Sequence, residues 1–546
     1  MTESYARGDT RLALLEETIG ANLDRMVSRF GDRDALISCA QGRRYSYTEL
    51  GAAVDELGRS LMAAGVATGD RIGIWSPNCA EWTLVQYATA KIGAILVNVN
   101  PAYRTSELEY ALAQSGCRML IAAPAFKSSD YRAMIAEVRE RLTALERVVF
   151  LDGPDWDELV AGGAKVRAED LRARAERLRP DDRINIQYTS GTTGFPKGAV
   201  LTHRNILNNG FFVGEGCRYT ESDRVCIPVP FYHCFGMVMG NLGATTHGAA
   251  MVIPAPAFDP EATLAACARE RCTSLYGVPT MFIAMLGHPE FDRYDLSSLR
   301  TGIMAGSPCP VEVMKRVIEL MHMDEVGICY GMTETSPVST QTAPDDPLDK
   351  RVGSVGRVHP HVEVKAIDPA DGRTVERGAG GELCTRGYSV MAGYWNDAER
   401  TAEAIDADGW MHTGDLATMD DDGYVNIVGR IKDMVIRGGE NVYPREVEEF
   451  LYGHPDIADV QVIGVPDQRY GEELMAWVIP RNGASLDADD VRRFCQGRIA
   501  HYKVPRYVKL VDGFPMTVTG KVQKFKMREL AIDELGLGAS AAVQTA

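Results

Sequence analysis

Apolar residues in the first part of the chain recur at helical spacing. Leu23, Met26, Val27 and Phe30 fall on one face of a predicted helix, and Gly31 is well placed to end it. The same spacing returns in a second predicted helix, with apolar positions at Leu50, Val54, Leu57 and Leu61. Apolar runs at Gly69–Trp75 (GDRIGIW) and Ile95–Asn100 (ILVNVN) predict short buried strands. Strands that alternate with helices predict an α/β fold with largely parallel sheets covered by helices.

The pattern changes near residue 430, where a smaller α+β module is predicted. Pro444 suits the first turn of a helix whose apolar stripe is Val447, Phe450 and Leu451. Two strands, a helix and a last strand should follow, at Val460–Val465, at Leu474–Ile479, around Val491, Phe494, Cys495 and Ile499, and at Arg506–Val511. This module has about the size of an ordinary domain.

Composition and charge narrow the class of protein. The 546 residues are too many for one core, and 45% of them are apolar. Lysine and arginine total 58 against 75 acids, a net charge of −17 that disfavours nucleic-acid binding and a polybasic membrane anchor. The twelve cysteines form no CxxC pair, so we expect reduced, mostly buried thiols.

Two further features concern location. No run of eighteen apolar residues occurs, so we expect no integral membrane segment. The N-terminal residues lack a basic region followed by an apolar stretch, so no signal peptide is expected. A cytoplasmic protein of several domains is the expectation, and its oligomeric state is not indicated.

The segment Tyr188–Gly198 (YTSGTTGFPKG) has the composition of a phosphate-binding loop. Glycine permits close approach of backbone to ligand, and Lys197 adds a compact positive charge. The Walker pattern requires glycine before the lysine and serine or threonine after it, whereas Pro196 and Gly198 stand here. A flexible linker would not normally combine a lysine with a proline-stiffened turn. The other predicted phosphate-binding residues are Thr189, Ser190, Gly191, Thr192, Thr193 and Gly194.

A second motif, Tyr330–Pro337 (YGMTETSP), follows a short predicted strand. An aromatic ring, a hydroxyl and a carboxylate at a strand end suit a base, a phosphate and Mg²⁺, respectively. Glu334 is the candidate Mg²⁺ ligand. The alternative is that Glu334 only caps a helix that begins after Thr333.

Three more candidates lie toward the C-terminus. Asp415 in HTGDLA could accept the two ribose hydroxyls of a nucleotide, or it could form a simple Asx-turn. Arg430 in GRIKD could share the ribose or a phosphate, although surface arginines are common. Lys521 in TGKVQK stands on a turn of small residues, where a lysine is usually solvated.

Together these motifs, in this order, resemble the adenylate-forming (AMP-binding) superfamily. This superfamily includes acyl-CoA synthetases, luciferase-like enzymes and the adenylation domains of peptide synthetases. The resemblance extends from WSPNCAEW at Trp75 to GKVQK at Lys521. It implies a large N-terminal domain of helix-covered sheets at residues 1–431, with the ATP and acyl sites. It also implies a small mobile α+β lid at residues 432–546, which carries the catalytic lysine.

The resemblance implies a reaction and a role for each motif. A carboxylic acid would react with ATP, release pyrophosphate and pass from the acyl-adenylate to a thiol. Residues 189–197 would hold the departing phosphates, Thr333 the α-phosphate and Glu334 the magnesium. Lys521 would neutralise negative charge as carboxylate and α-phosphate meet. The remaining nucleotide contacts would be Tyr330 on adenine, Gly306 and Ser307 opposite it, Gly331, and Asp415 with Arg430 on the ribose.

Other positions are implied by the same resemblance. Lys432 would be the hinge of the lid, and Gly438 and Gly439 would line a tunnel for CoA. His233 in FYHCFG would gate the tunnel or contact the carboxylate, or it would be a packed histidine that positions Tyr232 and Phe235. The acyl pocket would be formed by His233, Met237, Val238, Tyr276 and Met281, with the backbone of Gly331.

The acid and the acceptor are less strongly indicated. Gly236 and Met237 follow His233-Cys234-Phe235, where peptide-synthetase domains usually place an aspartate, so amino-acid activation is disfavoured. About 25 residues follow Lys521, too few for a carrier domain. The segment from Ser4 to Gly20 resembles the medium-chain fatty acyl-CoA synthetases.

The leading hypothesis is therefore a medium-chain fatty acid–CoA ligase, a magnesium-dependent enzyme of lipid metabolism with ATP and CoA as co-substrates. Its alternatives are a ligase for an aryl or branched acid, an enzyme that loads a separate carrier protein, and a non-catalytic nucleotide-binding regulator.

Overall fold

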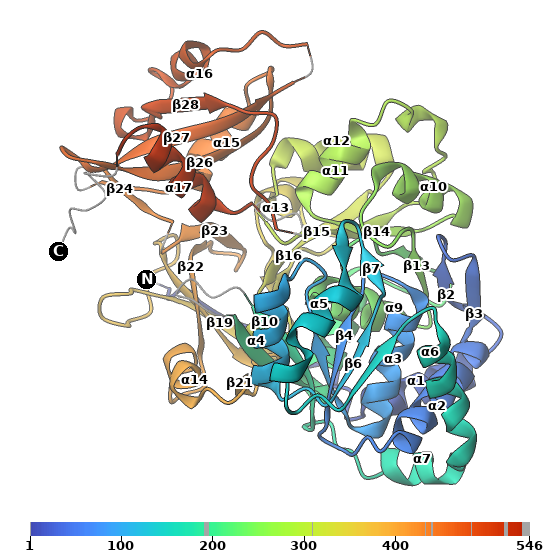
Figure 1. Ribbon diagram of the computed structural model, residues 1–546. Helices are drawn as coiled ribbons and strands as arrows, with labels where there is room; N and C mark the ends of the chain where they lie inside the picture. Colours follow the sequence, from blue (N-terminus) through green and yellow to red (C-terminus); the bar gives the residue numbers. More distant parts are fainter. Residues whose placement is uncertain are drawn as a thin grey trace.

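A computed structural model describes residues 2–189, 196–307, 309–431, 433–437, 440–481, 483–517 and 522–537. Three large sheets and their helices form the N-terminal part, and a fourth sheet forms a smaller C-terminal module (Figure 1). A minor hairpin is formed by β7 (Ala125–Phe126) and β8 (Ser129–Asp130). Within the described residues, no helix is both long enough and apolar enough to cross a bilayer.

The first sheet has seven strands in the order β21-β11-β10-β5-β4-β6-β9. Its segment from β10 to β9 is parallel, whereas β11 pairs antiparallel with β10 and β21. The strands are β4 (Arg71–Trp75), β5 (Ile95–Asn98), β6 (Met119–Ala122), β9 (Arg147–Phe150), β10 (Arg183–Thr189), β11 (Lys197–Thr202) and β21 (Gly393–Tyr394). The two strands predicted from apolar runs, β4 and β5, are confirmed.

The second sheet has nine strands in the order β18-β17-β16-β15-β14-β12-β13-β2-β3. Its central strands are parallel, and β3, β17 and β18 pair antiparallel at its edges. The strands are β2 (Asp34–Ser38), β3 (Arg43–Ser46), β12 (Arg224–Cys226), β13 (Ala250–Ile253), β14 (Ser274–Gly277), β15 (Thr301–Ala305), β16 (Glu325–Gly331), β17 (Val338–Gln341) and β18 (Arg357–Val358).

Helices cover and separate these two sheets. The α-helices are α1 (Ile19–Phe30), α2 (Tyr47–Ala63), α3 (Ala80–Ile92), α4 (Thr105–Ser115), α5 (Tyr131–Val138), α6 (Pro154–Ala161), α7 (Ala168–Ala175), α8 (His203–Gly216), α9 (Gly243–Thr245), α10 (Pro260–Glu270), α11 (Pro279–Leu286), α12 (Val311–Met321) and α13 (Leu348–Gly353). Shorter helical segments are η1 (Arg139–Arg141), η2 (Gly162–Lys165), η3 (Phe235–Leu242), η4 (Phe291–Arg293) and η5 (Thr333–Thr335). Both helices predicted from apolar spacing, α1 and α2, are confirmed.

The end of α1 differs in detail from the expectation. Gly31 ends the helix but keeps right-handed angles, with φ −41°, rather than the left-handed conformation usual for a terminal glycine. A Cβ at Gly31 would lie 2.7 Å from the Thr48 hydroxyl, so close packing against α2 explains the glycine. The start of α2 is fixed by a capping box between Ser46 and Glu49.

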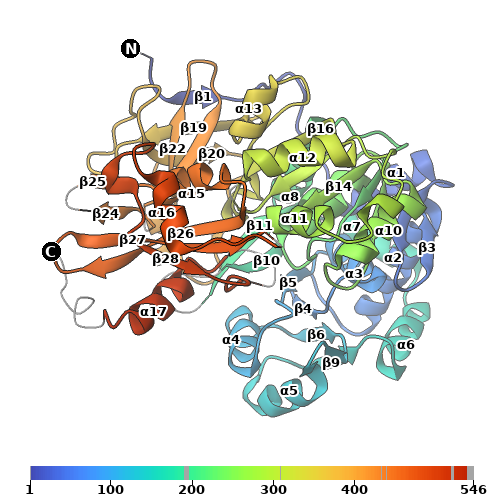
Figure 2. The same ribbon diagram turned by 90° about the horizontal axis from the view of Figure 1, so that it is seen from above.

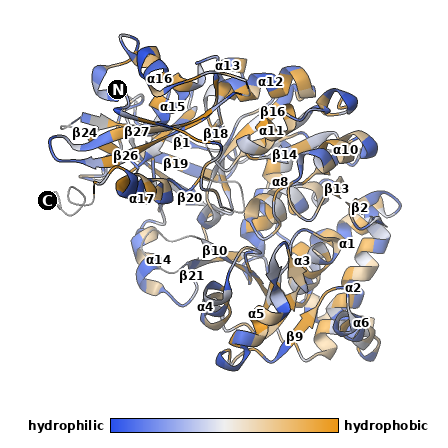
Figure 3. Ribbon diagram, turned by 45° about the horizontal axis from the view of Figure 1, so that its top comes forward, coloured by the Kyte–Doolittle hydropathy of each residue, from blue (hydrophilic) through white to orange (hydrophobic). Residues whose placement is uncertain are grey.

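Helix α3 lies between the two sheets and is buried along its whole length. A helix that is buried on every side needs partners for its polar groups. Lys91 in its last turn pairs with Asp24 of α1, at 2.5 Å, and with Asp55 of α2. Figure 3 shows hydrophobic colouring on β9, an edge strand of the first sheet.

The third sheet has five strands and is antiparallel throughout, in the order β1-β19-β20-β22-β23. This sheet was not expected, because the helix–strand alternation predicted largely parallel sheets. Its strands are β1 (Tyr5–Arg7), β19 (Val362–Ile367), β20 (Gly381–Gly387), β22 (Met411–Met419) and β23 (Val425–Arg430), with α14 (Ala398–Ala404) beside it.

The C-terminal module has an antiparallel sheet extended by one parallel strand, with helices on both faces (Figure 2). Along β27, Leu474, Ala476 and Val478 pack with α15 and α16, whereas Met475 and Trp477 pack with α17. The elements are β24 (Val435–Arg437), β25 (Glu440–Val442), β26 (Ile457–Asp467), β27 (Gly471–Pro480), β28 (Tyr507–Leu510), α15 (Pro444–Tyr452), α16 (Ala488–Cys495), α17 (Lys524–Glu534) and η6 (His501–Lys503).

The elements predicted for this module are confirmed, with one correction. Helix α16 ends at Cys495, so Ile499 lies beyond it and packs against the core from the following segment. The proposed boundary between residues 431 and 432 stays a prediction, because Lys432 lies outside the described residues. The two hydrophobic clusters of the module are formed by residues between Val435 and Leu537.

Candidate active site

Three predicted nucleotide contacts meet where strands of two different sheets come together. The Tyr330 hydroxyl, at the end of β16, donates to Oδ2 of Asp415 in β22 at 2.7 Å. Arg430 of β23 donates from Nε to Oδ1 of Asp415 at 2.9 Å. The Asp415 side chain is 9% exposed and that of Arg430 is 49% exposed. A carboxylate is therefore fixed by two donors beside a strand end, and a partly exposed cation lies next to it.

The local electrostatics follow from this contact. Burial, reinforced by the Asp415 charge, raises the pKa of Tyr330 well above its ordinary value, so its hydroxyl stays protonated and remains a donor. Burial lowers the pKa of Arg430, but the negative charges around it, of which Asp415 and Asp433 are the main ones, together outweigh burial and raise the pKa of the guanidinium. The Asp415 side chain does not form an Asx-turn, because its oxygens accept from the Tyr330 and Arg430 side chains.

Glu334 lies in a second polar cluster on the same segment. It is 4% exposed, and its Oε1 accepts from the Tyr394 hydroxyl at 2.9 Å and from Thr189 Oγ1 at 3.1 Å. Burial and the Glu334 charge raise the pKa of Tyr394. The Lys197 ammonium lies 5.0 Å from the centre of the Tyr394 ring. A carboxylate, two hydroxyls and a lysine therefore meet where the sequence predicts Mg²⁺ and phosphate.

The capping alternative for Glu334 does not describe its contacts. Residues Thr333–Thr335 form a single 3₁₀ turn, and the backbone N–H of Met332 donates to Thr335 Oγ1 at 3.1 Å. Thr335 therefore satisfies the start of this turn. The Glu334 side chain points instead to Thr189 and Tyr394.

Most of the predicted phosphate loop lies outside the described residues, namely Ser190, Gly191, Thr192, Thr193 and Gly194. The residues on either side are described. Thr189 and Lys197 are direct partners in the antiparallel pair of β10 and β11. Both ends of the loop are thus anchored in the seven-stranded sheet, next to Glu334.

Glycines shape the predicted adenine wall. Gly306 follows β15 with φ +90°, a conformation that favours glycine, and Ser307 comes next. At Gly331, an added Cβ would lie 1.7 Å from the carbonyl oxygen of Pro337. Only glycine can occupy position 331 with this backbone, whatever ligand it faces.

The predicted acyl segment forms an eight-residue π-helix, η3, which sequence patterns did not predict. Such helices are rare and are frequently found at functional sites. Met237 and Val238 lie in η3 and are buried, as are Tyr276 and Met281. The Tyr276 hydroxyl donates to the carbonyl of Met239 at 3.2 Å. These predicted pocket residues are therefore brought together in one buried region.

Amide side chains from the seven-stranded sheet hold this segment. Asn98 at the end of β5 donates to the Tyr232 carbonyl at 2.9 Å and to the Met237 sulfur at 3.3 Å. Gln187 of β10 donates to the same sulfur at 3.1 Å and accepts from the Cys234 thiol at 3.1 Å. Burial, with a further contribution from Glu334, raises the pKa of Cys234. The acyl segment therefore lies next to the Glu334 cluster.

His233 is half-buried, and its Nδ1 accepts from the backbone N–H of Phe235 at 3.1 Å. This is a local contact of the kind expected from a histidine that positions its neighbours. A role toward the substrate carboxylate stays a prediction. The Phe235 and Tyr276 rings lie 5.6 Å apart, which links the motif to the other wall of the predicted pocket.

The predicted catalytic, hinge and tunnel residues Lys521, Lys432, Gly438 and Gly439 lie outside the described residues, and their roles stay predictions. Their flanks are well held. Arg437 donates to Glu473 Oε1 at 3.0 Å and to the Tyr502 carbonyl at 2.8 Å. Met516 and Val522 pair on either side of residues 518–521.

Sequence reasoning missed two partners of the site. Tyr394 contacts Glu334, and Glu382 contacts the segment that carries Asp415. Neither belongs to a motif that was singled out, and both partners are distant in sequence. Only the pairing of β11 with β21 and of β20 with β22 brings them into place.

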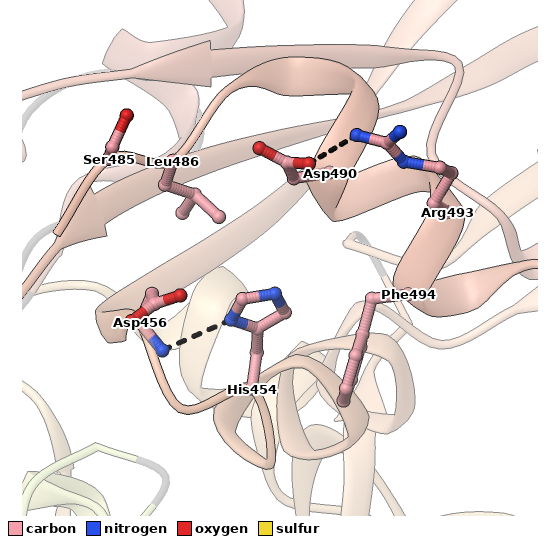
Figure 4. Close-up of a pocket in the computed structure, with 7 residues that line it drawn as sticks. All are labelled: His454, Asp456, Ser485, Leu486, Asp490, Arg493 and Phe494. Atoms are coloured by element: carbon pink, nitrogen blue, oxygen red, sulfur yellow. Dashed lines mark hydrogen bonds and ion pairs between the residues drawn. The ribbon is translucent and has the colours of Figure 1, made fainter.

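Two other features do not belong to this site. A surface cleft of about 390 Å³ lies in the C-terminal module and is drawn in Figure 4; its lining residues are His454, Asp456, Ser485, Leu486, Asp490, Arg493 and Phe494.

All twelve cysteines are free thiols, and all except Cys39 and Cys79 are buried. Cys226, Cys267 and Cys272 lie close together. Two of them, Cys267 and Cys272, are brought near each other at the end of α10, where the Cys272 N–H donates to the Cys267 carbonyl.

Comparison with protein families gives two matches that together cover most of the chain. Residues 23–395 match the family described as AMP-binding enzyme. Residues 446–521 match the family described as AMP-binding enzyme C-terminal domain.

Individual relatives match over nearly the full length. YngI of Bacillus subtilis (strain 168), assigned by name to the acyl-CoA synthetases, is 48% identical over 96% of this chain and 99% of its own. The mitochondrial medium-chain acyl-CoA ligase ACSF2 of Danio rerio is 43% identical over 98% of this chain and 92% of its own. The crystal structure of ATP-bound MatB from Rhodopseudomonas palustris is 30% identical, covers 95% of this chain and 100% of its own, and has a TM-score of 0.85.

Proposed function

The chain belongs to the AMP-binding enzyme family and is an AMP-forming acid–CoA ligase, and we propose that its acid is a medium-chain fatty acid. ATP and CoA are its co-substrates. The medium length of the acid is supported by the ACSF2 relatives, which are named for medium-chain acids. It is also consistent with the buried apolar side chains of η3, such as Met237 and Val238.

The observation that carries the proposal for the site is the hydrogen bond between two distant parts of the chain, from Tyr330 on the segment that leads to Glu334 to Asp415. Tyr330, which bonds Asp415, stands four residues before Glu334 on one strand end. Asp415 has both oxygens directed by donors and can accept ribose hydroxyls through its remaining lone pairs. A nucleotide held there would extend its phosphates toward Glu334 and Thr189.

Glu334 fits a hard cation. It is a nearly buried carboxylate beside the anchored ends of a predicted phosphate loop, and Mg²⁺ is usually held by one or two carboxylates together with phosphate oxygens. We propose that Glu334 holds Mg²⁺, which would neutralise phosphate charge. Thr333 would donate its hydroxyl to the α-phosphate, and Lys197 would pair with the departing phosphates.

The residues of this chain would support two successive transfers. In the first, a carboxylate oxygen of the acid attacks the α-phosphorus and pyrophosphate leaves; Lys521 would offset the charge that builds there. In the second, the CoA sulfur, deprotonated, attacks the acyl carbonyl carbon and AMP leaves. We propose that residues 432–546 pivot at Lys432 between these steps, with Gly438 and Gly439 beside the path of CoA.

Pyrophosphate release across a panel of acids tests this assignment. Straight-chain acids of increasing length, a branched acid and an aryl acid would be assayed with and without CoA. We expect the highest kcat/KM for medium-chain acids and accumulation of acyl-CoA only when CoA is present. A preference for the aryl or branched acid would overturn the chain-length proposal. Transfer to a carrier protein but not to CoA would contradict the ligase assignment itself.

A further inference from the structure

The segment that presents Asp415 is a bulge in the antiparallel sheet. Glu382 of β20 pairs with Leu416 of β22, and Cys384 pairs with His412. Residues 413–415 therefore lie opposite Leu383 alone. Bulges next to active sites re-aim side chains, and this one directs Asp415 toward Tyr330 and Arg430.

The carboxylate of Glu382 spans the base of this bulge. Its Oε1 accepts from the backbone N–H of Gly414 at 3.1 Å, and its Oε2 lies 3.1 Å from His412 Nδ1. The Glu382 side chain is 12% exposed and that of His412 is 32% exposed, so the Glu382–His412 contact is only partly shielded from water. The Glu382 carboxylate therefore contacts both His412, directly before the bulge, and Gly414, at the centre of the bulge.

Gly414, held by Glu382, is connected to two neighbouring parts of the site. It has φ +70°, a conformation that favours glycine, and the next residue is Asp415. Its carbonyl accepts from the N–H of Ile431 at 3.0 Å, directly before the predicted hinge at Lys432. The conformation of Gly414 therefore sets the direction of Asp415 and supports the end of the segment that follows Arg430.

Glu382, Cys384 and His412 are also close enough to hold a metal ion. The hydrogen bonds account for the cluster without one, because each Glu382 oxygen already has a protein partner. A bound cation would have to displace the Glu382–His412 contact. The two explanations predict different responses to chelation.

We propose that Glu382 is a positioning residue for ATP binding, which fixes the Thr413–Asp415 bulge and thereby aims Asp415 at the nucleotide sugar. The inference rests on the proposed role of Asp415. Glu382 itself does not touch the substrate.

Steady-state kinetics of Glu382→Ala, Glu382→Gln and Asp415→Ala test the proposal. Loss of a hydrogen bond to a charged group lowers affinity by roughly 10-fold or more, so Glu382→Ala should raise the KM for ATP by about that factor. The KM for the acid should change less than about twofold, by the same reasoning, since no acyl contact is lost. Glu382→Gln keeps a carbonyl oxygen for Gly414 and should restore most of the ATP affinity.

Glu363→Ala is the matched control. Glu363 is a carboxylate on the neighbouring strand β19 that pairs with Arg386 at 2.9 Å and does not contact the bulge. Its loss should leave the KM for ATP unchanged. Gly414→Ala supplies a second probe of the bulge, because a Cβ there meets no atom within 4 Å and only the positive φ is penalised.

The possible results distinguish a failure of the positioning role of Glu382 from a failure of the proposed ribose site at Asp415. A raised KM for ATP in Asp415→Ala but not in Glu382→Ala or Gly414→Ala overturns the positioning role alone. An unchanged KM in Asp415→Ala overturns the proposed ribose site. Equal loss in Glu382→Gln and Glu382→Ala, or a loss of ATP affinity on chelation that zinc restores in Mg²⁺ buffer, would also contradict the hydrogen-bonding role.

Discussion

The two halves of the proposed site are built differently. In the N-terminal part, Asp415 and Glu334 are nearly buried and already engaged by donors from other strands. The C-terminal module has hydrophobic clusters of its own, and one of its contacts with the larger part is the hydrogen bond from the Arg445 guanidinium to the Ile427 carbonyl, at 2.7 Å. The carboxylates proposed to bind the nucleotide and Mg²⁺ are thus held in place by hydrogen bonds within the N-terminal part. In the proposed reaction, the module supplies the charge of Lys521 to that arrangement.

This contrast predicts that losses on the two sides will affect different steps. Changes in the N-terminal cluster should weaken ATP binding, because its donors and acceptors are preorganised for one ligand. Changes in the module should alter the rate of one half-reaction and leave ATP binding largely intact.

The largest effect is expected for Lys521→Ala. Removal of one charge-stabilising donor commonly costs on the order of 10²-fold in rate, so adenylate formation should fall by that factor or more. Formation of acyl-CoA from supplied acyl-adenylate should suffer much less. Pyrophosphate release and acyl-CoA formation, measured separately, check this. Equal losses in both would remove the distinction between the two halves of the site.

A smaller effect is expected for Lys432→Pro, which restricts φ at the proposed pivot. At least one half-reaction should slow by roughly tenfold, the factor that about 1.4 kcal/mol of added barrier produces. ATP affinity, measured by calorimetry, should stay close to that of the unchanged enzyme. Unaltered turnover in both half-reactions would rule out a pivot at this position.

Acid should separate the stabilities of the two regions. Burial lowers the pKa of His203 and of His359 to about 3, so the folded N-terminal part keeps both neutral while the unfolded chain protonates them below pH 6.5. Their contribution to stability is complete above pH 6.5 and is lost as the pH falls toward 3. Burial raises the pKa of Asp459 to about 6, so the folded C-terminal module gains stability as the pH falls from 6 toward 3.8.

Hydrogen exchange at pH 7 and pH 5, corrected for intrinsic rates, measures this difference. Amides of α8, which begins at His203, should lose protection at pH 5 relative to those of β26, which contains Asp459. Parallel changes in both elements would show that these buried groups do not control the acid response.

The smallest effect is expected for Asp459→Asn. Asp459 accepts from the Tyr452 hydroxyl and from the Val460 N–H, and an amide oxygen can replace it. A pKa raised by about two units corresponds to a penalty on the order of 1–3 kcal/mol at neutral pH, which the amide avoids. Urea unfolding of the variant should show a more stable C-terminal module at pH 7 and a flatter profile between pH 4 and pH 6. A less stable module would mean that the Asp459 charge is favourable there.

Local patterns predicted the helices α1 and α2 and the parallel strands β4 and β5 of the larger part, together with the main elements of the C-terminal module. Helix α1 was predicted because its apolar residues recur within one short segment, and β4 because an apolar run follows a glycine turn. The antiparallel sheet was missed because β20 and β22 pair across an intervening helix, and no local pattern specifies that partner. The π-helix was missed because its apolar spacing does not distinguish it from an ordinary buried helix.

The chemistry of the site was easier to predict than its support. Glu334, Asp415 and Arg430 were predicted because their residue types suit a cation and a sugar. Tyr394 and Glu382 were missed because they act on those residues through contacts that only the folded sheets create. Residues that would contact the substrates can be found from sequence motifs. Residues that orient them are found only once the strand pairing is known.

The most direct test of acid activation follows the oxygen atoms of the acid. A medium-chain acid labelled with ¹⁸O in its carboxylate would be incubated with the enzyme, ATP, Mg²⁺ and CoA, and the products would be analysed by mass spectrometry. Attack of the carboxylate on the α-phosphorus predicts one ¹⁸O in AMP, none in pyrophosphate, and the other in the acyl-CoA carbonyl. Label in inorganic phosphate with formation of ADP, or AMP without label, would contradict an acyl-adenylate.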